Sequence, residues 1–172
     1  MNEELLRRIA LLIFDVDGVL SSQTIPLGYD GVPVRTANIH DGYAMQLAIK
    51  RGLPVAIISG AKTETLRVRY QGLGLQDIHL GVAIKMDCYE RLLSKYGLTD
   101  AQVLYMGDDI PDYQVMARCA LPVCPFDAAP EIRALARYVS PCKGGEGCVR
   151  DVIEQVLKAQ GKWMGDNVAF GW

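Results

Sequence analysis

The chain has 172 residues, of which 50% are hydrophobic and 22% charged, and its formal net charge is −2. This length suits one well-cored domain over residues 1–172, and the balance of apolar and charged residues excludes an intrinsically disordered chain. A near-neutral charge gives no electrostatic basis for binding nucleic acid or an anionic membrane, so we expect neither partner.

The composition also argues against secretion, a membrane span and a structural zinc site. Residues 1–10 lack the charged-then-apolar layout of a secretory signal, and no apolar run approaches the roughly 20 residues needed to span a bilayer. The five cysteines form no CxxC pair and only two histidines are present, which indicates free thiols. We therefore expect a cytoplasmic protein.

Short apolar runs rich in β-branched residues alternate with segments of helical period. This alternation predicts an α/β fold, namely a three-layer α/β/α, Rossmann-like parallel sheet with helices on both faces. In chain order, strands are expected at residues 11–16, 53–58, 77–80, 102–106 and 121–124. Helices are expected at residues 42–51, 63–73, 85–96, 112–119, 129–137 and 147–160.

Two segments depart from this alternation. Residues 21–39 are punctuated by prolines and glycines, with a plausible turn at residues 29–31, so we expect a β-hairpin insert. Residues 161–172 show little periodicity and carry Trp163, Phe170 and Trp172. Because a domain of this size can leave such aromatic residues uncovered, we expect an irregular tail that docks on another subunit.

Polar residues follow three of the expected strands at their carboxyl ends. Asp15 and Asp17 close the first strand, Ser59 and Gly60 follow the second, and Asp108 follows the fourth. In open α/β sheets, ligands bind beyond the carboxyl ends of the strands. The parallel topology therefore brings these groups to one edge of the sheet and predicts a site there.

The residue types at this edge suit phosphoryl transfer. An Asp15 carboxylate oxygen can attack phosphorus and form an aspartyl phosphate. Asp17, two residues on, can protonate the leaving oxygen and later deprotonate the attacking water. Mg²⁺ prefers oxygen ligands, which the Asp15 carboxylate, the main-chain carbonyl of Asp17 and Asp108 would supply. The sequence thus predicts a Mg²⁺-dependent phosphatase.

Further residues are expected to support this chemistry. Ser59 and the Gly60 N–H can donate to the phosphoryl oxygens, and Lys85 can provide positive charge. Asp109 and Asp112 are expected to hold the metal ligand and the lysine in place. Taken alone, each motif has a simpler interpretation, such as a solvated turn or a helix cap. Their joint order and spacing favour a catalytic site.

These residues resemble the four motifs of the haloacid dehalogenase superfamily of phosphatases. The matching positions are residues 15–20 (DVDGVL), Ser59, Lys85 and residues 107–112 (GDDIPD). The resemblance implies that Asp15 is the nucleophile, that Asp17 is the acid and base, and that Asp108 binds Mg²⁺.

Most members of this superfamily insert a cap domain between the first two motifs or after the second. Here only residues 21–39 separate the first strand from the next helix, so we expect no cap domain. The chain resembles the capless branch that includes 3-deoxy-D-manno-octulosonate 8-phosphate (KDO 8-phosphate) phosphatases. Further similarities are residues 38–42 (NIHDG), Arg69, residues 144–150 (GGEGCVR) and residues 157–162 (LKAQGK).

The resemblance implies a sugar acid phosphate as substrate and a homotetramer in which the hairpin insert and a neighbouring subunit close the site. Arg69 or Arg67 would grip the carboxylate of the sugar acid, and Asn38 and Asp41 would also contribute to substrate binding. The implied activity is hydrolysis of KDO 8-phosphate through an aspartyl phosphate, as part of lipopolysaccharide sugar biosynthesis.

Two alternatives stay open. A related capless branch acts on KDN 9-phosphate and carries an acidic residue just after the glycine of the second motif, where this chain has Ala61. A non-catalytic module that binds a sugar phosphate or regulates a partner enzyme would be expected to lack one of the motif aspartates, and all are present.

Overall fold

The fold is given by a computed structural model that describes residues 1–171. Its centre is a six-stranded sheet in the order β3-β2-β1-β4-β5-β6, in which every neighbouring pair is parallel. The strands are β1 (Leu11–Phe14), β2 (Val55–Ile58), β3 (Asp77–His79), β4 (Val103–Met106), β5 (Leu121–Cys124) and β6 (Tyr138–Val139). The helices are α1 (Glu3–Arg8), α2 (Ile39–Lys50), α3 (Glu64–Gln71), α4 (Lys85–Tyr96), α5 (Tyr113–Arg118), α6 (Pro130–Leu135) and α7 (Cys148–Ala159).

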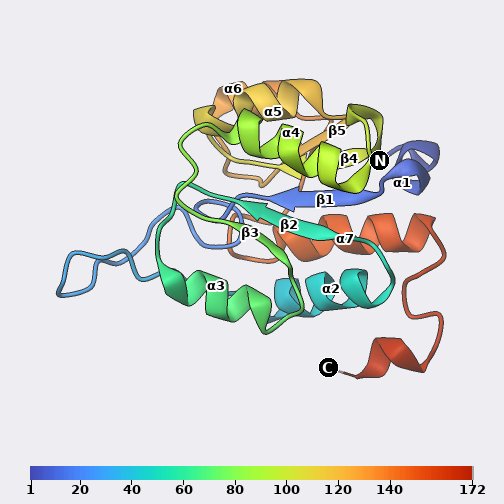
Figure 1. The fold of residues 1–172 in the computed structure, drawn as a ribbon, viewed down its shortest axis with the longest axis horizontal. Coiled ribbons are helices and arrows are strands. Elements are labelled where there is room, and N and C mark those ends of the chain that lie inside the picture. The colour runs from blue at the N-terminus through green and yellow to red at the C-terminus, as the bar shows by residue number, and fades with distance from the viewer. Residues whose placement is uncertain (172) are drawn as a thin grey trace.

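Helices cover both faces of this sheet, with α2, α3 and α7 on one side and α4, α5 and α6 on the other (Figure 1). Successive strand residues point to opposite faces. Leu12 and Phe14 therefore belong to one buried cluster, whereas Leu11 and Ile13 belong to the other. A sheet buried on both faces explains why its strands read as continuous apolar runs. The predicted three-layer α/β/α fold is confirmed.

All the strands and helices expected from the sequence are present, with boundaries that differ by a few residues. Among the described residues, one α-helix, α1, and one strand, β6, were not predicted. Leu6 is the one buried residue of α1, and β6 has two residues, so neither carries a detectable hydrophobic period. Helix α2 begins at Ile39, three residues earlier than expected, because the Asn38 side chain caps it by accepting hydrogen bonds from the N–H groups of His40 and Asp41.

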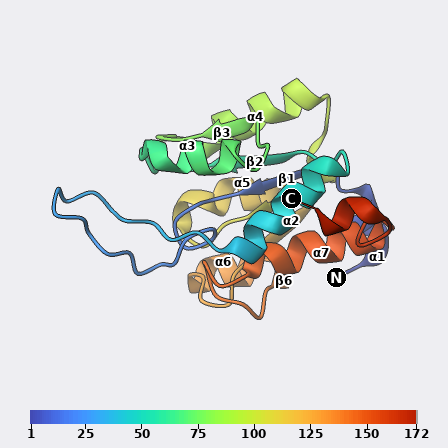
Figure 2. The ribbon, with the colours of Figure 1, turned by 90° about the horizontal axis from the view of Figure 1, so that it is seen from below.

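The insert predicted as a β-hairpin is an arm, residues 21–38, that projects away from the helices and the sheet (Figures 1 and 2). The Gly31 N–H donates to the Gly28 carbonyl (2.9 Å), and the Gly28 N–H donates to the Val32 carbonyl (2.8 Å). The predicted turn is therefore present. Instead of a strand ladder, the two legs share one isolated antiparallel bridge, between Leu27 and Pro33, because proline has no N–H to extend the pairing.

No separate cap domain stands over the sheet within residues 1–171. In the same part of the chain, no helix has both the length and the apolar character required to cross a membrane. All five cysteines are free, as expected.

The tail packs against α2 and α7 of its own chain. The rings of Tyr43 and Trp163 meet edge to face, with centroids 6.3 Å apart, and Arg51 pairs with Asp166 at 2.6 Å. A short 3-10 helix, Asn167–Phe170, follows in a segment expected to be irregular. Phe170 is exposed, and Trp172 lies outside the described residues. Docking of this tail on another subunit stays a prediction.

The interface between α7 and α2 gives a test of the core. Ile153 of α7 is completely buried in the cluster that α2 shares, so Ile153→Ala should lower the free energy of unfolding by about 2–5 kcal/mol, measured by urea denaturation. Lys158→Ala on the exposed side of the same helix should change it by less than about 0.5 kcal/mol. Equal losses in both variants would contradict this packing.

Candidate active site

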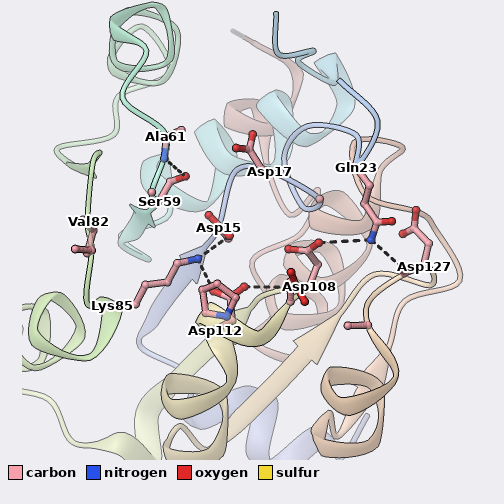
Figure 3. Close-up of a pocket in the computed structure, with 16 residues that line it drawn as sticks. Asp15, Asp17, Gln23, Ser59, Ala61, Val82, Lys85, Asp108, Asp112 and Asp127 are labelled. Atoms are coloured by element: carbon pink, nitrogen blue, oxygen red, sulfur yellow. Dashed lines mark hydrogen bonds and ion pairs between the residues drawn. The ribbon is translucent and has the colours of Figure 1, made fainter. Parts of the chain in front are cut away.

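Polar side chains from separate elements meet at the carboxyl edge of the sheet (Figure 3). Asp15 follows β1, Ser59 follows β2, Asp108 follows β4, and Lys85 begins α4. They line a cavity of about 660 Å³. The other residues around it are Asp17, Gly18, Gln23, Gly60, Ala61, Val82, Ala83, Asp109, Pro111, Asp112, Asp127 and Ala129. The structure thus brings together the groups that were predicted to meet at the carboxyl edge of the sheet.

Lys85 connects two buried carboxylates at the floor of this cavity. Its Nζ donates to Asp15 Oδ2 at 2.6 Å and to Asp112 Oδ1 at 2.7 Å. Asp112 also accepts from the Tyr105 hydroxyl (2.6 Å) and from the main-chain N–H of Asp108 (3.2 Å). Asp112 therefore fixes both the lysine and the loop after β4, which is the position that its predicted orienting role requires.

The Asp15 carboxylate is held on both oxygens. Oδ1 accepts from the Val16 N–H at 2.6 Å, and Oδ2 faces Lys85. Burial and the neighbouring Asp112 charge raise the pKa of Asp15 to about 6, although Lys85 opposes them. The nucleophile proposed from the sequence is thus an ordered, largely buried carboxylate beside an ammonium group.

Asp15, Asp108 and Asp112 offer carboxylate oxygens that all lie within 4.8 Å of one another. Burial, and then the charges of Asp15 and Asp112, raise the pKa of Asp108 to about 8. Three carboxylates against the single ammonium of Lys85 leave negative charge that a divalent cation would offset. The residues present therefore fit Mg²⁺, which takes oxygen ligands.

The metal ligands predicted from the sequence include the main-chain carbonyl of Asp17, whereas the carboxylate cluster includes Asp112. Asp112 already accepts three hydrogen bonds, so it is better placed to support the site than to bind metal. Each Asp15 oxygen accepts one hydrogen bond, and Asp108 Oδ2 lies 3.5 Å from Gln23 Nε2. Lone pairs on both carboxylates therefore stay available to an ion, and the main-chain carbonyl of Asp17 stays the third predicted ligand. Gly18 lets Asp108 approach, because a Cβ there would lie 1.9 Å from Asp108 Oδ2 and the backbone φ is +76°.

Asp17 forms a paired contact that the sequence did not predict. Arg35 of the arm donates from Nε to Asp17 Oδ1 (2.6 Å) and from Nη2 to Oδ2 (2.8 Å). Its Nη1 donates to the Thr63 hydroxyl at 2.8 Å. Arg35 is the one basic residue in the arm, and that was the only signal for it in the sequence.

Ser59 and Gly60 lie on the wall of the cavity, as their predicted role requires. The Ser59 N–H donates to the His79 carbonyl (2.9 Å), and its Oγ accepts from the Ala61 N–H (3.2 Å). These bonds fix the loop after β2. Gly60 is exposed, so its backbone is accessible from the cavity.

Four residues predicted to bind substrate do not line this cavity. The Asn38 Nδ2 donates to the Gly145 carbonyl (3.2 Å), and Asp41 Oδ1 accepts from the Arg150 N–H (2.6 Å). Both side chains thus tie α2 to the start of α7. Arg67 Nη1 donates to the Ile78 carbonyl (3.0 Å), and Arg69 lies against Gly42 of α2. Their roles toward substrate stay predictions.

Two further residues near Asp108 were also missed. Gln23 Nε2 donates to the Asp127 carbonyl at 2.7 Å and lies 3.5 Å from Asp108 Oδ2. Asp127 Oδ1 in turn accepts from the Gly144 N–H at 3.0 Å. These contacts join the arm, the loop after β5 and the glycine-rich loop before α7. They link residues far apart in the sequence, so no local pattern indicates them.

Known proteins are similar to this chain in sequence and in fold. No protein-family model matches the chain. The 3-deoxy-D-manno-octulosonate 8-phosphate phosphatase KdsC of Yersinia pestis is 40% identical over 157 residues, which cover 91% of this chain and 84% of that protein. This chain belongs to the KdsC family. The Yersinia pestis crystal structure superposes with a TM-score of 0.89 at 38% identity, covering 93% of this chain and 86% of that one.

Two other solved structures are also similar to this chain. A Legionella pneumophila hydrolase of HAD superfamily subfamily III A matches with a TM-score of 0.89 and 32% identity, covering 93% of this chain and 88% of that one. The Moraxella catarrhalis KDO 8-phosphate phosphatase, solved with magnesium ion, phosphate ion and KDO, matches with a TM-score of 0.88 and 30% identity over 92% of this chain and 91% of that one. The resemblance to the haloacid dehalogenase superfamily is confirmed.

Repulsion among the carboxylates predicts a pH-dependent effect of Asp108→Asn. A carboxyl whose pKa rises from 3.8 to about 8 on folding is protonated more readily in the folded state, so its contribution to stability falls as pH rises between those values. Without Mg²⁺, Asp108→Asn should therefore raise Tm more at pH 8 than at pH 5, measured by thermal unfolding in EDTA.

Glu131 on α6 provides the control, because its side chain is exposed and is not among the charges that raise the pKa of Asp108. Glu131→Gln should change Tm by a small amount that is similar at the two pH values. A gain for Asp108→Asn that does not grow between pH 5 and pH 8 would contradict the raised pKa of Asp108.

Proposed function

We propose that this chain is a Mg²⁺-dependent phosphatase that hydrolyses KDO 8-phosphate to KDO and inorganic phosphate in lipopolysaccharide sugar biosynthesis. The observation that carries the proposal is the Asp15 carboxylate, ordered by Lys85 beside Asp108 at the open edge of the sheet. Membership of the KdsC family supports the same substrate.

In this mechanism an Asp15 oxygen attacks phosphorus and forms an aspartyl phosphate, while the sugar oxygen leaves. Lys85 Nζ, which touches Asp15 Oδ2, lies close enough to the reacting group to offset charge on the phosphoryl oxygens. Ser59 and the Gly60 backbone N–H would donate to the same oxygens from the opposite loop. Water then hydrolyses the aspartyl phosphate and regenerates Asp15.

Asp15, Asp108 and the main-chain carbonyl of Asp17 would hold Mg²⁺. When bound, the ion offsets the repulsion between the Asp15 carboxylate and the phosphate dianion. Asp112 supports the site by fixing Lys85 and the main chain of Asp108.

Asp17 is proposed to move the protons. Its side chain lines the cavity two residues after the nucleophile, so it can donate a proton to the leaving sugar oxygen. The resulting carboxylate can then take a proton from the water that attacks the aspartyl phosphate. One carboxyl group therefore serves both steps.

The substrate is proposed to be a sugar acid phosphate, with Arg69, Arg67, Asn38 and Asp41 retained as predicted substrate residues. KDN 9-phosphate is the alternative substrate. Ala61, which lines the cavity where the branch acting on that substrate would have an acidic residue, favours KDO 8-phosphate.

We also propose that the chain acts in the cytoplasm as one domain and assembles as a homotetramer. The arm supports assembly, since Leu27 is 71% exposed, and Tyr29 and Val34 are exposed as well. Apolar side chains on a projecting segment are typical of an interface between subunits.

Replacing the nucleophile tests the covalent mechanism. Asp15→Asn should lower kcat by at least about 10⁴-fold, because an amide is a poor nucleophile at phosphorus. Phosphate release is the measurement. The exposed Glu131→Gln variant on α6 should keep wild-type turnover. Substantial turnover by a folded Asp15→Asn protein would refute the aspartyl phosphate.

A panel of phosphate esters tests the substrate. With Mg²⁺, kcat/KM for KDO 8-phosphate should exceed that for KDN 9-phosphate and for sugar phosphates without a carboxylate, and EDTA should abolish turnover. A preference for KDN 9-phosphate would establish the alternative substrate. Binding of KDO 8-phosphate without hydrolysis of any ester would instead indicate a non-catalytic module.

A further inference from the structure

Arg35 holds the side chain of Asp17 with a geometry suited to a carboxylate ligand. Two guanidinium nitrogens meet the two carboxylate oxygens at 2.6 Å and 2.8 Å. Such a planar fork binds a carboxylate more specifically than an ammonium group does. The Arg35 side chain is only 9% exposed, so a nearby anion is needed to stabilise its charge.

This pairing conflicts with the work proposed for Asp17. A group that transfers a proton to the leaving oxygen must turn one of its own oxygens toward that atom. Both Asp17 oxygens instead face Arg35. Turning one of them toward the leaving oxygen would open the pair and leave a largely buried guanidinium without a partner unless another anion replaces Asp17.

The proposed substrate class supplies that anion. A sugar acid phosphate carries a carboxylate in addition to its phosphate, and Lys85 and the loop after β2 serve the phosphate. Of the described residues around the cavity, six are aspartates, and Lys85 is the one lysine or arginine. A second anionic group of the substrate therefore needs another cation, and Arg35 adjoins the cavity through Asp17.

We propose that Arg35 binds the carboxylate of the substrate and that Asp17 takes its place when no substrate is bound. Substrate binding thereby frees Asp17 for proton transfer. Thr63 keeps Arg35 in position during the exchange, because its hydroxyl accepts from the third guanidinium nitrogen, Nη1, at 2.8 Å. The inference rests on the proposed function and makes Arg35 a residue that determines specificity.

The other arginines near α3 are less suited to this role in the structure. Arg67 donates to the carbonyl of Ile78, and Arg69 lies against Gly42. Within residues 1–171 neither of them lines the cavity, and the Arg67 side chain bonds to Glu64 and Ile78, which do not line it either. Arg35 contacts Asp17 directly.

The test compares two phosphate esters of sugar hydroxyl groups that differ in the carboxylate, KDO 8-phosphate and glucose 6-phosphate, so that both leaving oxygens need the same protonation. In Arg35→Gln, the ratio of their kcat/KM values should shift against KDO 8-phosphate by about 30-fold or more. Arg35→Lys should recover part of that ratio, since it keeps the charge and loses the fork. Arg118→Gln, which removes an arginine paired with Glu90 and Asp100 outside the cavity, should keep the wild-type ratio.

Product inhibition supplies a second readout. The inhibition constant of KDO should rise in Arg35→Gln much more than that of inorganic phosphate. Equal losses on both substrates, or equal weakening of both inhibitors, would show that Arg35 only positions Asp17 and would overturn the proposal. Loss of selectivity in Arg69→Gln with retention in Arg35→Gln would also overturn it.

The same measurements separate this inference from the proposed function. A wild-type enzyme without a preference for KDO 8-phosphate over glucose 6-phosphate would overturn the proposed substrate, and the role of Arg35 with it. A wild-type preference that survives Arg35→Gln would overturn the role of Arg35 alone.

Discussion

The site depends on a charge imbalance that the fold enforces. Asp15, Asp108 and Asp112 crowd their carboxylates around the single ammonium of Lys85 in a largely buried place. Such an arrangement is unfavourable by itself, because burial and like charges both oppose ionisation. The raised pKa values of Asp15 and Asp108 are the consequence. A site that repels negative charge in this way is suited to a cation, and with the cation to a phosphate.

The parallel sheet supplies the force that holds these groups together. The strands that carry Asp15 and Asp108 are neighbours in the sheet, with Phe14 opposite Met106. Their apolar side chains are completely buried on both faces. Burial of the strands therefore fixes the loops that follow them, and the energy gained in the core offsets the cost of gathering the carboxylates.

This organisation explains how much could be predicted from the sequence. The strands are short apolar runs and the motif aspartates follow them directly, so strand ends and site residues could be located together. The position of Lys85 at the start of α4 was predicted for the same reason. These features are local in sequence, and the parallel topology brings the carboxyl ends of the strands to one edge of the sheet.

The features that sequence analysis missed are contacts between distant segments. Arg35 reaches Asp17 across 18 residues, and Asn38 reaches Gly145 across 107. The sequence of the arm does not indicate which carboxylate its one arginine will pair with. Asn38 and Asp41 are predicted to bind substrate, and in the structure Asn38 also caps α2 and Asp41 holds the start of α7. These structural contacts depend on tertiary packing, which the local motif does not show, and the role of both residues toward substrate stays a prediction.

The arm links specificity to assembly. Its base carries Arg35 to Asp17, whereas its tip exposes Leu27 and Tyr29. Within residues 1–171 no separate cap domain stands over the sheet, so this arm is the segment that carries both the exposed tip and the arginine beside the cavity. An interface formed by the tip would restrict the motion of the arm and keep the guanidinium near Asp17. In a capless enzyme of this kind, selection of the substrate and association of subunits would then depend on the same short segment of the chain.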